Sequence, residues 1–320
     1  MVLNVLDFEK PIAELDSNIN ELKSMSEAEG VDRSAEISEL EEHRDRLITE
    51  IFLNLTAWDK TLTARHPNRP YSLDYIRMIF DDFTELHGDR LFADDKAMIG
   101  GIASLNGELV MVVGHQKGRD LKERQYRNFG SAKPDGYRKA GRLMKLAEKF
   151  NRPIICLVDT PAADCGIGSE ERGISEAIAR NMFLMSTLKV PVVVIVIGEG
   201  GSGGAIGIAV GNRILMLEHS IYSVIPPEGC AAIIWRDASK GAEAAEALRL
   251  TAQSALQNGV IDEIIPEPLG GAHRSHDKAA VILKQAITES LSLLQKLSPE
   301  ELVEQRYQKF RAMGIFGISS

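Results

Sequence analysis

The chain has 320 residues, of which 44% are apolar and 26% are charged, a composition typical of a globular protein rather than a disordered or fibrous one. Its 37 lysines and arginines against 46 aspartates and glutamates give a net charge of −9, which argues against nucleic acid as the main ligand. The length allows one large domain or two.

The cysteine pattern argues for a reducing compartment. Cys156, Cys165 and Cys230 contain no CxxC pair and fit neither a disulfide framework nor a closed zinc site, so a cytoplasmic location is expected. The first residues carry Asp7 and Glu9 and lack the basic leader of a signal peptide. The apolar run 190–197 is much shorter than the roughly 20 residues that span a bilayer, so no membrane segment is predicted.

The first 65 residues predict a helical hairpin. Residues 12–25 form one predicted helix, and apolar residues at three- and four-residue steps over 37–55 predict a second. The apolar stripe would pack on the rest of the protein or dock to a second chain. Pro67 and Pro70 then interrupt regular structure. We therefore expect residues 1–70 to form an N-terminal helical arm that makes subunit contacts, and residues 71–320 to form the main domain.

From residue 98 onward, predicted strands and helices alternate. Asn106 and Gly107 separate strands at 98–105 and 109–113, a strong hairpin signal. Apolar runs at 153–158 and 192–197 predict strands buried on both faces. The other predicted elements are helices at 137–150, 170–188, 205–210, 238–258, 277–297 and 299–313, and strands at 213–217, 221–225 and 260–265. This order predicts an α/β fold with helices on the faces of a sheet.

The glycine-rich run GEGGSGGA at 198–205 follows a predicted strand and allows three interpretations. Gly198, Gly200 and Gly203 match the dinucleotide fingerprint GxGxxG, with an acidic residue, Glu218, downstream. The elbow GxSxG fits Ser202, with Asp262 and His273 later in the hydrolase order. The third interpretation needs no nucleophile, because backbone N–H groups at a helix start can hold an oxyanion or a carboxylate.

A second turn, DTPAADCGIG at 159–168, also joins a buried strand to a helix. Two such turns in successive units would meet at the same edge of the sheet, where α/β proteins usually bind ligands. A cationic segment at 117–139 is either a solvated helix or a site for a phosphorylated ligand or an acidic partner.

Longer motifs show a resemblance that covers nearly the whole chain. They are LDFE at 6–9, PIAEL at 11–15, RHP and RPY within 65–71, GDR at 88–90, GHQKGR at 114–119, NFG at 128–130, GYRKA at 136–140, EERG at 170–173, SEAIARN at 175–181, GEGGSGGA at 198–205, PEGC at 227–230 and IPEPLGGAHR at 265–274. With these motifs the chain resembles the alpha-subunit family of the carboxyltransferase component of bacterial-type, multisubunit acetyl-CoA carboxylase.

The resemblance implies a crotonase-type (ClpP/crotonase-like) spiral of ββα units with an N-terminal helical arm and C-terminal helices. It implies an enzyme that moves a carboxyl group from N-carboxybiotin to acetyl-CoA, giving malonyl-CoA for fatty acid synthesis. Biotin would be attached to a biotin carboxyl carrier protein rather than to this chain. The implied partners are a carboxyltransferase beta subunit in an α2β2 assembly, the carrier protein and biotin carboxylase. Zinc belongs to the beta subunit in this family, so none is expected here.

The resemblance also assigns roles to residues. The backbone amides of Gly203, Gly204 and Ala205 would stabilise the anion that forms on biotin as it loses its carboxyl group, and Ser202 becomes a turn residue. Residues that would contact carboxybiotin are Gly200, Gly201, Gly166, Ile167 and Gly168. Residues that would contact CoA or an acidic partner are Lys117, Arg119 and Lys122.

The second turn departs from the family pattern Asp-Thr-Pro-Gly-Ala-Tyr-Pro-Gly. Ala162 replaces the first glycine, and Asp164 with Cys165 replaces Tyr-Pro. If that glycine needs a positive φ, Ala162 is strained, and Asp164 adds an anion near an anionic substrate. Two alternatives therefore stand beside the main one. The chain would be a variant or regulatory subunit with an altered biotin-side loop, inhibitor-insensitive or non-catalytic, or a crotonase-type thioester hydrolase that uses Ser202.

Overall fold

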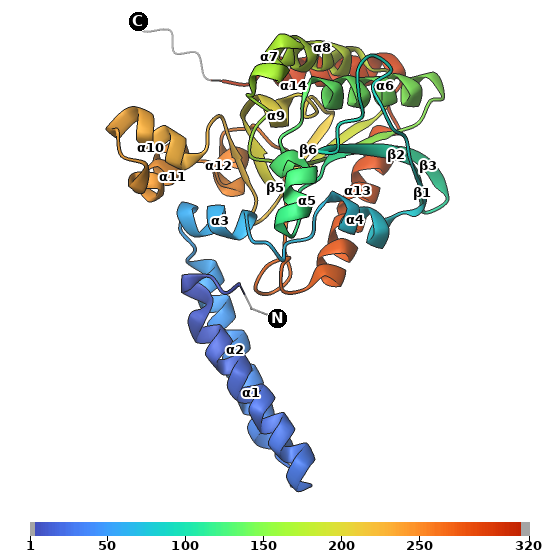
Figure 1. Cartoon of the computed structure of the whole chain (residues 1–320). Helices are drawn as coiled ribbons and strands as arrows, with labels where there is room; N and C mark the ends of the chain where they lie inside the picture. The colour runs from blue at the N-terminus through green and yellow to red at the C-terminus, as the bar shows by residue number, and fades with distance from the viewer. Residues whose placement is uncertain (1–3, 315–320) are drawn as a thin grey trace, which may run out of the picture.

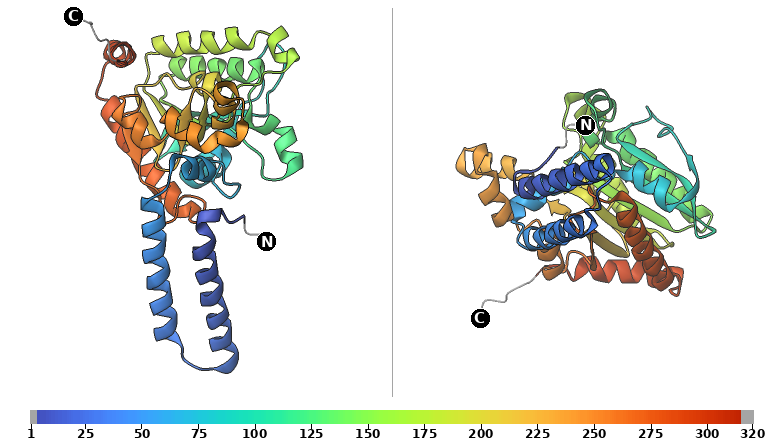
Figure 2. Two further views of the ribbon diagram at one scale, coloured as in Figure 1. Left: turned by 90° about the vertical axis from the view of Figure 1, so that its left-hand side faces the viewer. Right: turned by 90° about the horizontal axis from the view of Figure 1, so that it is seen from below.

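The computed structural model describes residues 4–314, which form an α/β body and a projecting helical hairpin (Figure 1). The hairpin consists of α1 (Lys10–Glu29) and α2 (Ser34–Leu53), which run side by side away from the body (Figure 2). This confirms the predicted pair of helices. The next helix, α3 (Ala57–Ala64), packs against the body, so the projecting part of the chain ends with α2.

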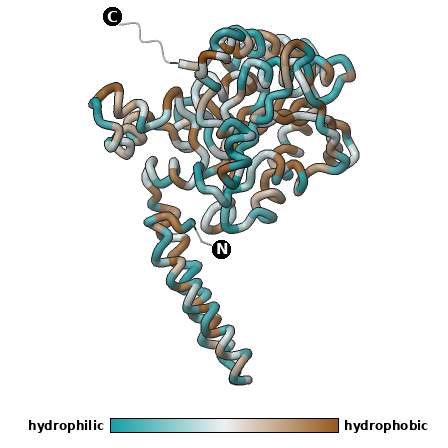
Figure 3. Tube along the Cα trace, in the orientation of Figure 1, coloured by the Kyte–Doolittle hydropathy of each residue, from teal (hydrophilic) through white to brown (hydrophobic). Residues whose placement is uncertain are grey.

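The apolar stripe of the hairpin is used mainly between its own two helices. Ile12 and Ile19 of α1 and Ile48 of α2 are buried, and brown apolar positions recur along both helices between teal polar ones (Figure 3). The expectation that the stripe packs on the body is therefore wrong for most of its length, whereas docking of the arm to a second chain stays a prediction. Only its base reaches the body, where Ile48 lies close to Gly270.

The body is built on one eight-stranded sheet in the order β1-β2-β3-β4-β5-β6-β8, with β7 paired to the end of β5. The strands are β1 (Asp81–Glu85), β2 (Met98–Leu105), β3 (Glu108–His115), β4 (Ile154–Thr160), β5 (Val192–Gly201), β6 (Arg213–Leu217), β7 (Ile221–Ser223) and β8 (Glu263–Ile265). The first three strands are antiparallel and the rest are parallel. Asn106 and Gly107 join β2 to β3 with φ of 52° and 85°, which confirms the predicted hairpin.

Helices cover both faces of the sheet, as the fully apolar strands predict. On one face, α6 (Pro134–Lys149) and α8 (Ile174–Thr187) pack on alternate residues of the central strands, such as Cys156 and Val194. On the other face, α4 (Ser72–Ile79) and α13 (His276–Leu294) pack on the residues between them, such as Leu157 and Ile195. These strands are therefore buried on both faces.

Two predicted helices are each broken in the structure. The predicted helix 170–188 is divided into α7 (Ile167–Glu171) and α8 at Gly173, whose φ is 74°. The predicted helix 238–258 is divided into α11 (Gly241–Leu248) and α12 (Ala252–Gln257) near Arg249, whose φ is 50°. A residue in the left-handed region cannot continue an α-helix, so each chain segment changes direction there.

The structure also contains elements that the sequence pattern did not indicate. They are α3, α4, β1, α5 (Leu121–Tyr126) and α10 (Pro227–Trp235), with short 3-10 turns at Asp7–Glu9, Asn128–Gly130 and Ala238–Lys240. The chain closes with α13 and α14 (Pro299–Arg311), which confirms the two predicted C-terminal helices. No helix within residues 4–314 combines the length and the apolar character that a membrane crossing needs.

Candidate active site

The glycine-rich run lies at the carboxyl end of β5 and the start of α9 (Ser202–Ile206). The strand was expected to end at residue 197, but it continues through Gly201, and the turn occurs at Ser202, whose φ is 49°. A Cβ added at Gly201 would lie 1.9 Å from the carbonyl oxygen of Pro161. Glycine is required here because the strand passes so close to the second turn.

The second turn lies directly against the first. A Cβ added at Gly204 would lie 2.6 Å from both the carbonyl carbon of Ala162 and the amide nitrogen of Ala163. The two turns therefore form one rim at the carboxyl edge of the sheet, as their positions after neighbouring parallel strands predict. Beyond Ala163 the second turn leads to Gly166, the N-cap of α7, and to Ile167, which is 80% exposed.

The three backbone N–H groups expected to donate hydrogen bonds, those of Gly203, Gly204 and Ala205, occupy different positions in α9. Gly201 is the N-cap of α9, so Gly203 and Gly204 are its second and third residues and Ala205 is its fourth. N–H groups before the fourth residue have no acceptor within a helix, whereas the N–H of the fourth faces the N-cap carbonyl. Gly203 and Gly204 are thus better placed than Ala205 to donate to a ligand. Tyr137 holds the carbonyl of Gly204 by donating a hydrogen bond of 3.1 Å.

A hollow of about 380 Å³ opens beside this turn. Its walls come from α9, from β7 and the residue after it, and from the ends of α11 and α12, and they comprise Ser202, Gly203, Ile206, Tyr222, Ser223, Val224, Leu248, Arg249, Ala255, Asn258 and Val260. These walls contain neither a histidine nor a carboxylate, so no lining side chain can serve as a general base for Ser202.

The two residues that the hydrolase interpretation would pair with Ser202 are engaged elsewhere. His273 lies 2.8 Å from a carboxylate oxygen of Glu9 at the base of the arm. Asp262 accepts a hydrogen bond from the amide of Ile214 (2.7 Å) and pairs with Lys309 (2.5 Å). The Ser-Asp-His interpretation of the glycine-rich run is therefore not supported.

Charged side chains lie behind the turn, where Asp159 and Glu199 are buried, Lys117 is largely buried, and Arg65 and Glu228 are partly exposed. The ammonium of Lys117 is 2.7 Å from Asp159 at the end of β4 and 2.7 Å from Glu199 within β5. Arg65 donates from the other side to Glu199 (2.7 Å) and to Glu228 (2.5 Å). We call these five residues the buried ion network. It ties the segment after β3, the ends of β4 and β5 and the start of α10 together.

The pKa values follow from this arrangement. Burial opposes the charge of Lys117, but the two carboxylates outweigh it and raise the pKa of Lys117. Burial raises the pKa of Asp159 even though Lys117 opposes the rise. For Glu199, burial is outweighed by Lys117 and Arg65, which hold the pKa of that carboxyl below its usual range. Glu199 is therefore a buried carboxylate between two cations.

The expected contact of Lys117 with CoA or an acidic partner conflicts with its surroundings, whereas those of Arg119 and Lys122 stay predictions. Lys117 is enclosed in the buried ion network and is not free to meet a phosphate. Arg119 bonds to Asp74 (2.5 Å) and lies over the ring of Tyr71 at 4.7 Å, so it fixes the start of α4. Arg119 and Lys122, which lies on α5, are both exposed, so these two side chains keep surface open to a ligand.

The arginines of the RHP and RPY motifs hold structural roles that their sequence pattern did not indicate. Arg69 is fully buried, donates to the carbonyl of Ile197 in β5 (2.8 Å) and forms two bonds to Glu267 (2.8 and 2.5 Å). Arg65 belongs to the buried ion network. Two arginines in a short proline-containing segment next to the predicted apolar domain could have indicated buried ion pairs. A guanidinium that becomes buried needs carboxylate partners.

His115 lies at the end of β3 near the carbonyl of Gly204. Burial, with a smaller contribution from the charge of Lys117, lowers the pKa of His115 to about 3. Its imidazole is therefore neutral at physiological pH, and it is packed beneath the turn rather than exposed to a ligand.

Ala162 and Asp164, at which the second turn differs from the family pattern, fit the fold without backbone strain. Ala162 is not among the residues with positive φ, so the expected backbone strain is absent. Asp164 accepts hydrogen bonds from Asn128 (3.0 Å) and Ser169 (2.5 Å). Although burial opposes ionisation, these bonds lower the pKa of Asp164. Its carboxylate holds the start of α7 in place.

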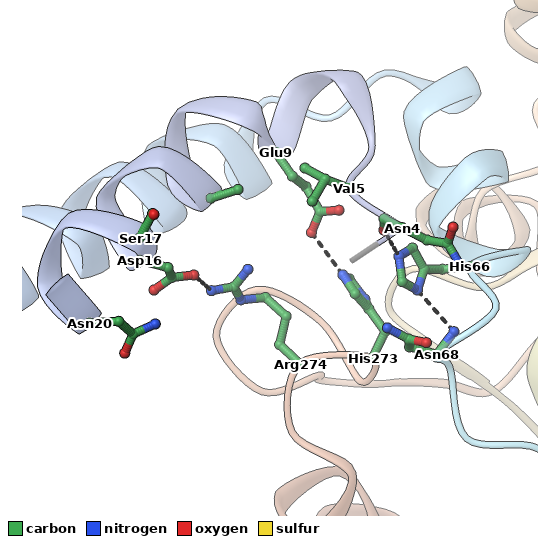
Figure 4. A pocket seen from close by; sticks show the side chains of 11 residues that line it. Asn4, Val5, Glu9, Asp16, Ser17, Asn20, His66, Asn68, His273 and Arg274 are labelled. Atoms are coloured by element: carbon green, nitrogen blue, oxygen red, sulfur yellow. Dashed lines mark hydrogen bonds and ion pairs between the residues drawn. The ribbon is translucent and has the colours of Figure 1, made fainter. Parts of the chain in front are cut away.

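A second polar hollow, of about 440 Å³, lies where the arm joins the body (Figure 4). Glu9, His66 and His273 place one ligand atom each within 4.8 Å of one another. However, Nδ1 of His66 accepts from the amide of Asn68 (3.2 Å), so its Nε2 carries the proton and donates to the carbonyl of Asn4 (2.6 Å). A metal-bound histidine donates from its second nitrogen, so His66 does not fit a metal ligand. The cluster therefore connects the arm to the body through hydrogen bonds.

A family model described as acetyl co-enzyme A carboxylase carboxyltransferase-like matches residues 5–314. The chain belongs to this family. The acetyl-coenzyme A carboxylase carboxyl transferase subunit alpha of Geobacter metallireducens is 58% identical over 311 residues, 97% of this chain and 98% of the relative. The corresponding subunit of Listeria monocytogenes is 54% identical over 313 residues, 98% of each chain. The chain is therefore an enzyme subunit of acetyl-CoA carboxylase, as the motifs predict.

Solved structures confirm the crotonase-type fold of the body. The 12S transcarboxylase, solved with methylmalonyl-coenzyme A and methylmalonic acid bound, matches with a TM-score of 0.57 at 20% identity, over 71% of this chain and 42% of that one. A Pseudomonas malonate decarboxylase hetero-dimer matches with a TM-score of 0.54 at 17% identity, over 67% of this chain and 88% of that one.

Proposed function

We propose that this alpha subunit transfers the carboxyl group of N-carboxybiotin to acetyl-CoA, forming malonyl-CoA. The main support for the proposal is that, in a chain of this family, the two turns form one rim at the carboxyl edge of the sheet. Gly203 and Gly204 hold the early helix positions of α9, where N–H groups remain available. Gly201 and Gly204 leave room where a Cβ would collide with the second turn, so the backbone itself forms the wall.

When bound, carboxybiotin supplies the carboxyl group, its ureido oxygen gains negative charge as that group leaves, and its nitrogen can take a proton from the acetyl methyl group. The chain's contribution is to donate hydrogen bonds from Gly203 and Gly204, with Ala205 closing the turn. Each preorganised donor at a developing oxyanion contributes about 2.7–4 kcal/mol. No side-chain base is needed, in agreement with the lining of the hollow.

The other proposed carboxybiotin contacts are Gly200, Gly201, Gly166, Ile167 and Gly168, which lie along the same two turns. The buried ion network supports them from behind, because Glu199 immediately precedes Gly200 in β5. Asp159 also accepts a hydrogen bond from the amide of Glu199 (3.0 Å). A strand end held by two buried ion pairs keeps the donors in fixed geometry, on which efficient catalysis depends.

We further propose that the chain assembles with a carboxyltransferase beta subunit as α2β2 and receives biotin on a separate carrier protein loaded by biotin carboxylase. The arm formed by residues 1–70 would contribute subunit contacts, and the cytoplasm remains the predicted location. No zinc is expected in this chain, because its three cysteines are too scattered for a closed site: Cys156 and Cys230 are buried, and Cys165 is exposed in the second turn.

The proposal is tested by mixing the purified chain with the beta subunit of the same organism and assaying malonyl-CoA formation from acetyl-CoA and carboxybiotin. Activity that requires both subunits supports it. A stable complex without activity would favour a non-catalytic or regulatory subunit with an altered second turn. Thioester hydrolysis by this chain alone would favour the hydrolase alternative.

A further inference from the structure

The five-residue helix α9 leaves one carbonyl of the glycine-rich turn without its ordinary backbone donor. In a continuous α-helix, the carbonyl of Gly204 would accept from the N–H of Ile208, four residues later. That N–H donates instead to the carbonyl of Ala205 (3.1 Å), and the N–H of Gly207 donates to the carbonyl of Gly203 (3.2 Å). Both N–H groups that end the helix are therefore directed to carbonyls other than that of Gly204.

Tyr137 of α6 supplies the donor that the backbone does not. Its hydroxyl donates a hydrogen bond of 3.1 Å to the carbonyl of Gly204, and its side chain is fully buried. Burial, with a smaller contribution from the charge of Asp95, raises the pKa of Tyr137, so the hydroxyl keeps its proton at physiological pH. Gly204 is itself buried, and a buried carbonyl that lost this donor would be left unsatisfied.

The position of Tyr137 is fixed from two sides. Asn181 of α8, which is also buried, donates a hydrogen bond of 2.8 Å to the backbone carbonyl of Tyr137. The tyrosine ring lies against the end of α9, where a Cβ added at Gly207 would be 2.6 and 2.7 Å from two ring carbons. The φ of Gly207 is −60°, so glycine is needed there for this close approach rather than for its backbone conformation. The hydroxyl is therefore held in place by packing and by a neighbouring helix.

The orientation of the peptide between Gly204 and Ala205 matters for the proposed reaction. The carbonyl and the N–H of one peptide unit lie in one plane and point in opposite directions, so a bond that fixes the carbonyl of Gly204 also fixes the N–H of Ala205. The N–H of Gly204 is attached to the Cα at the other end of that carbonyl carbon, so its direction depends on the same bond. Donors that are already fixed need no reorganisation when charge develops in the transition state.

We propose that Tyr137 is a positioning residue for carboxyl transfer, whose hydroxyl keeps the backbone N–H groups at the start of α9 directed at the developing oxyanion. The inference rests on the proposed function and adds to it a side chain that acts without touching the substrate. Tyr137 is fully buried and does not line the hollow beside the turn, so it acts through the backbone of Gly204 rather than on a ligand.

The test uses the complex of the full-length chain with the beta subunit of the same organism and measures kcat and KM for malonyl-CoA formation. Tyr137→Phe removes the hydroxyl and keeps the ring packed against Gly207. Tyr75→Phe is the matched control, because Tyr75 of α4 is also a fully buried tyrosine but packs on the opposite face of the sheet. Gly207→Ala is a second variant, which displaces the ring of Tyr137 while keeping its hydroxyl.

We expect Tyr137→Phe to lower kcat about 10-fold, because the donors should move by less than the displacement of about 1 Å that costs about 100-fold. The KM for acetyl-CoA should stay within about 2-fold of the parent, since the donors act in the transition state. Gly207→Ala should lower kcat similarly, and Tyr75→Phe should not. In a complex that carries Gly204→Ala, Tyr137→Phe should cause little further loss, because both changes act on the same donors.

Several outcomes would refute the proposal. One is a kcat of Tyr137→Phe within about 2-fold of the parent, and another is a raised KM with unchanged kcat, which would indicate lost ground-state binding. An equal loss in Tyr75→Phe would show a general effect of removing a buried hydroxyl. Full additivity with Gly204→Ala would show that Tyr137 acts independently of the turn. If Tyr137→Phe fails to fold, a kcat of Gly207→Ala equal to that of the parent refutes the proposal.

Hydrogen exchange distinguishes failure of this proposal from failure of the proposed function. Loss of the anchoring bond should speed amide exchange in residues 203–206 of Tyr137→Phe but not of Tyr75→Phe, whatever the activity of the complex. Unchanged exchange in that segment would contradict the anchoring by Tyr137. A parent complex that forms no malonyl-CoA would instead contradict the proposed function. Urea denaturation checks that each variant is folded before either measurement.

Discussion

Replacing Gly204 with alanine tests whether the backbone of the two turns sets the activity. The added Cβ would lie 2.6 Å from the backbone of Ala162 and Ala163, whereas an ordinary contact begins at 3.4 Å. Both neighbours are backbone atoms, so α9 and the second turn must separate by about 0.8 Å or distort by a similar amount. The φ of Gly204 lies outside the left-handed region, so the collision, not backbone strain, is the perturbation.

The expected loss of activity follows from that displacement. A shift approaching 1 Å at a reacting group costs about 100-fold, and removing one oxyanion donor costs about 100- to 1,000-fold in kcat. Gly204→Ala should therefore lower kcat at least about 100-fold with little change in KM, because the lost interaction is made in the transition state. Overpacking should cost only about 1–3 kcal/mol in free energy of unfolding.

The assay is malonyl-CoA formation by the complex reconstituted with the beta subunit. Gly229→Ala is the control, because its added Cβ meets only the flexible side chain of Ile225, at 3.4 and 3.5 Å. This variant should keep its activity. A Gly204→Ala complex with kcat within about 3-fold of the parent would rule out a catalytic role for this turn, since a displaced donor cannot leave the transition state equally stabilised.

Three further predictions concern the residues around the turns. Lys117→Met leaves the carboxylates of Asp159 and Glu199 buried without their shared cation and should lower the free energy of unfolding by about 3–5 kcal/mol, measured by urea denaturation. A loss below about 1 kcal/mol would contradict the buried ion network. For His115, a pKa of about 3 in the folded chain against about 6.5 when unfolded means that its contribution to stability is complete above pH 6.5. That contribution falls by up to about 5 kcal/mol as the pH drops toward 3. The free energy of unfolding of His115→Gln should therefore fall less steeply than that of the parent between about pH 6.5 and 3. An equally steep fall would show that His115 is not buried in its neutral form. Asp164→Ala removes the acceptor of Ser169 and should cost about 1–3 kcal/mol. Faster hydrogen exchange in α7 would confirm it, and unchanged protection would contradict it.

The elements of the fold that could be predicted from the sequence are those that neighbouring residues determine by themselves. The β2–β3 hairpin was predictable because Asn106 and Gly107 adopt positive φ readily, whatever the rest of the chain does. Strands β4 and β5 were predictable because burial on both faces leaves an uninterrupted apolar run. The breaks at Gly173 and Arg249 were not, because helical periodicity continues across them. A left-handed arginine is disfavoured locally, and here the next residues, Leu250 and Thr251, pair with β7.

Of the candidate site, the sequence allowed a prediction of the close backbone turns but not of the side-chain contacts around them. Consecutive glycines indicate close approach wherever they occur, and both turns do meet. The role of Lys117 was not predictable, because a lysine facing solvent and one facing two carboxylates look identical in sequence. Its partners lie far along the chain, at Asp159 and Glu199, and only the parallel order of β3, β4 and β5 brings them together. The same holds for Arg69 and Glu267, which are 198 residues apart.

The central claim is that backbone amides, rather than a side-chain nucleophile or base, carry the chain's part of the chemistry. The most direct measurement is the carboxyl-transfer rate of Ser202→Ala in the reconstituted complex. This change removes the hydroxyl but leaves every amide of the turn in place. If the backbone amides do this work, kcat should stay within about 3-fold of the parent, whereas loss of a true nucleophile would lower it by about 10,000-fold or more. A loss of that size would show that the hydroxyl of Ser202 takes part in the reaction.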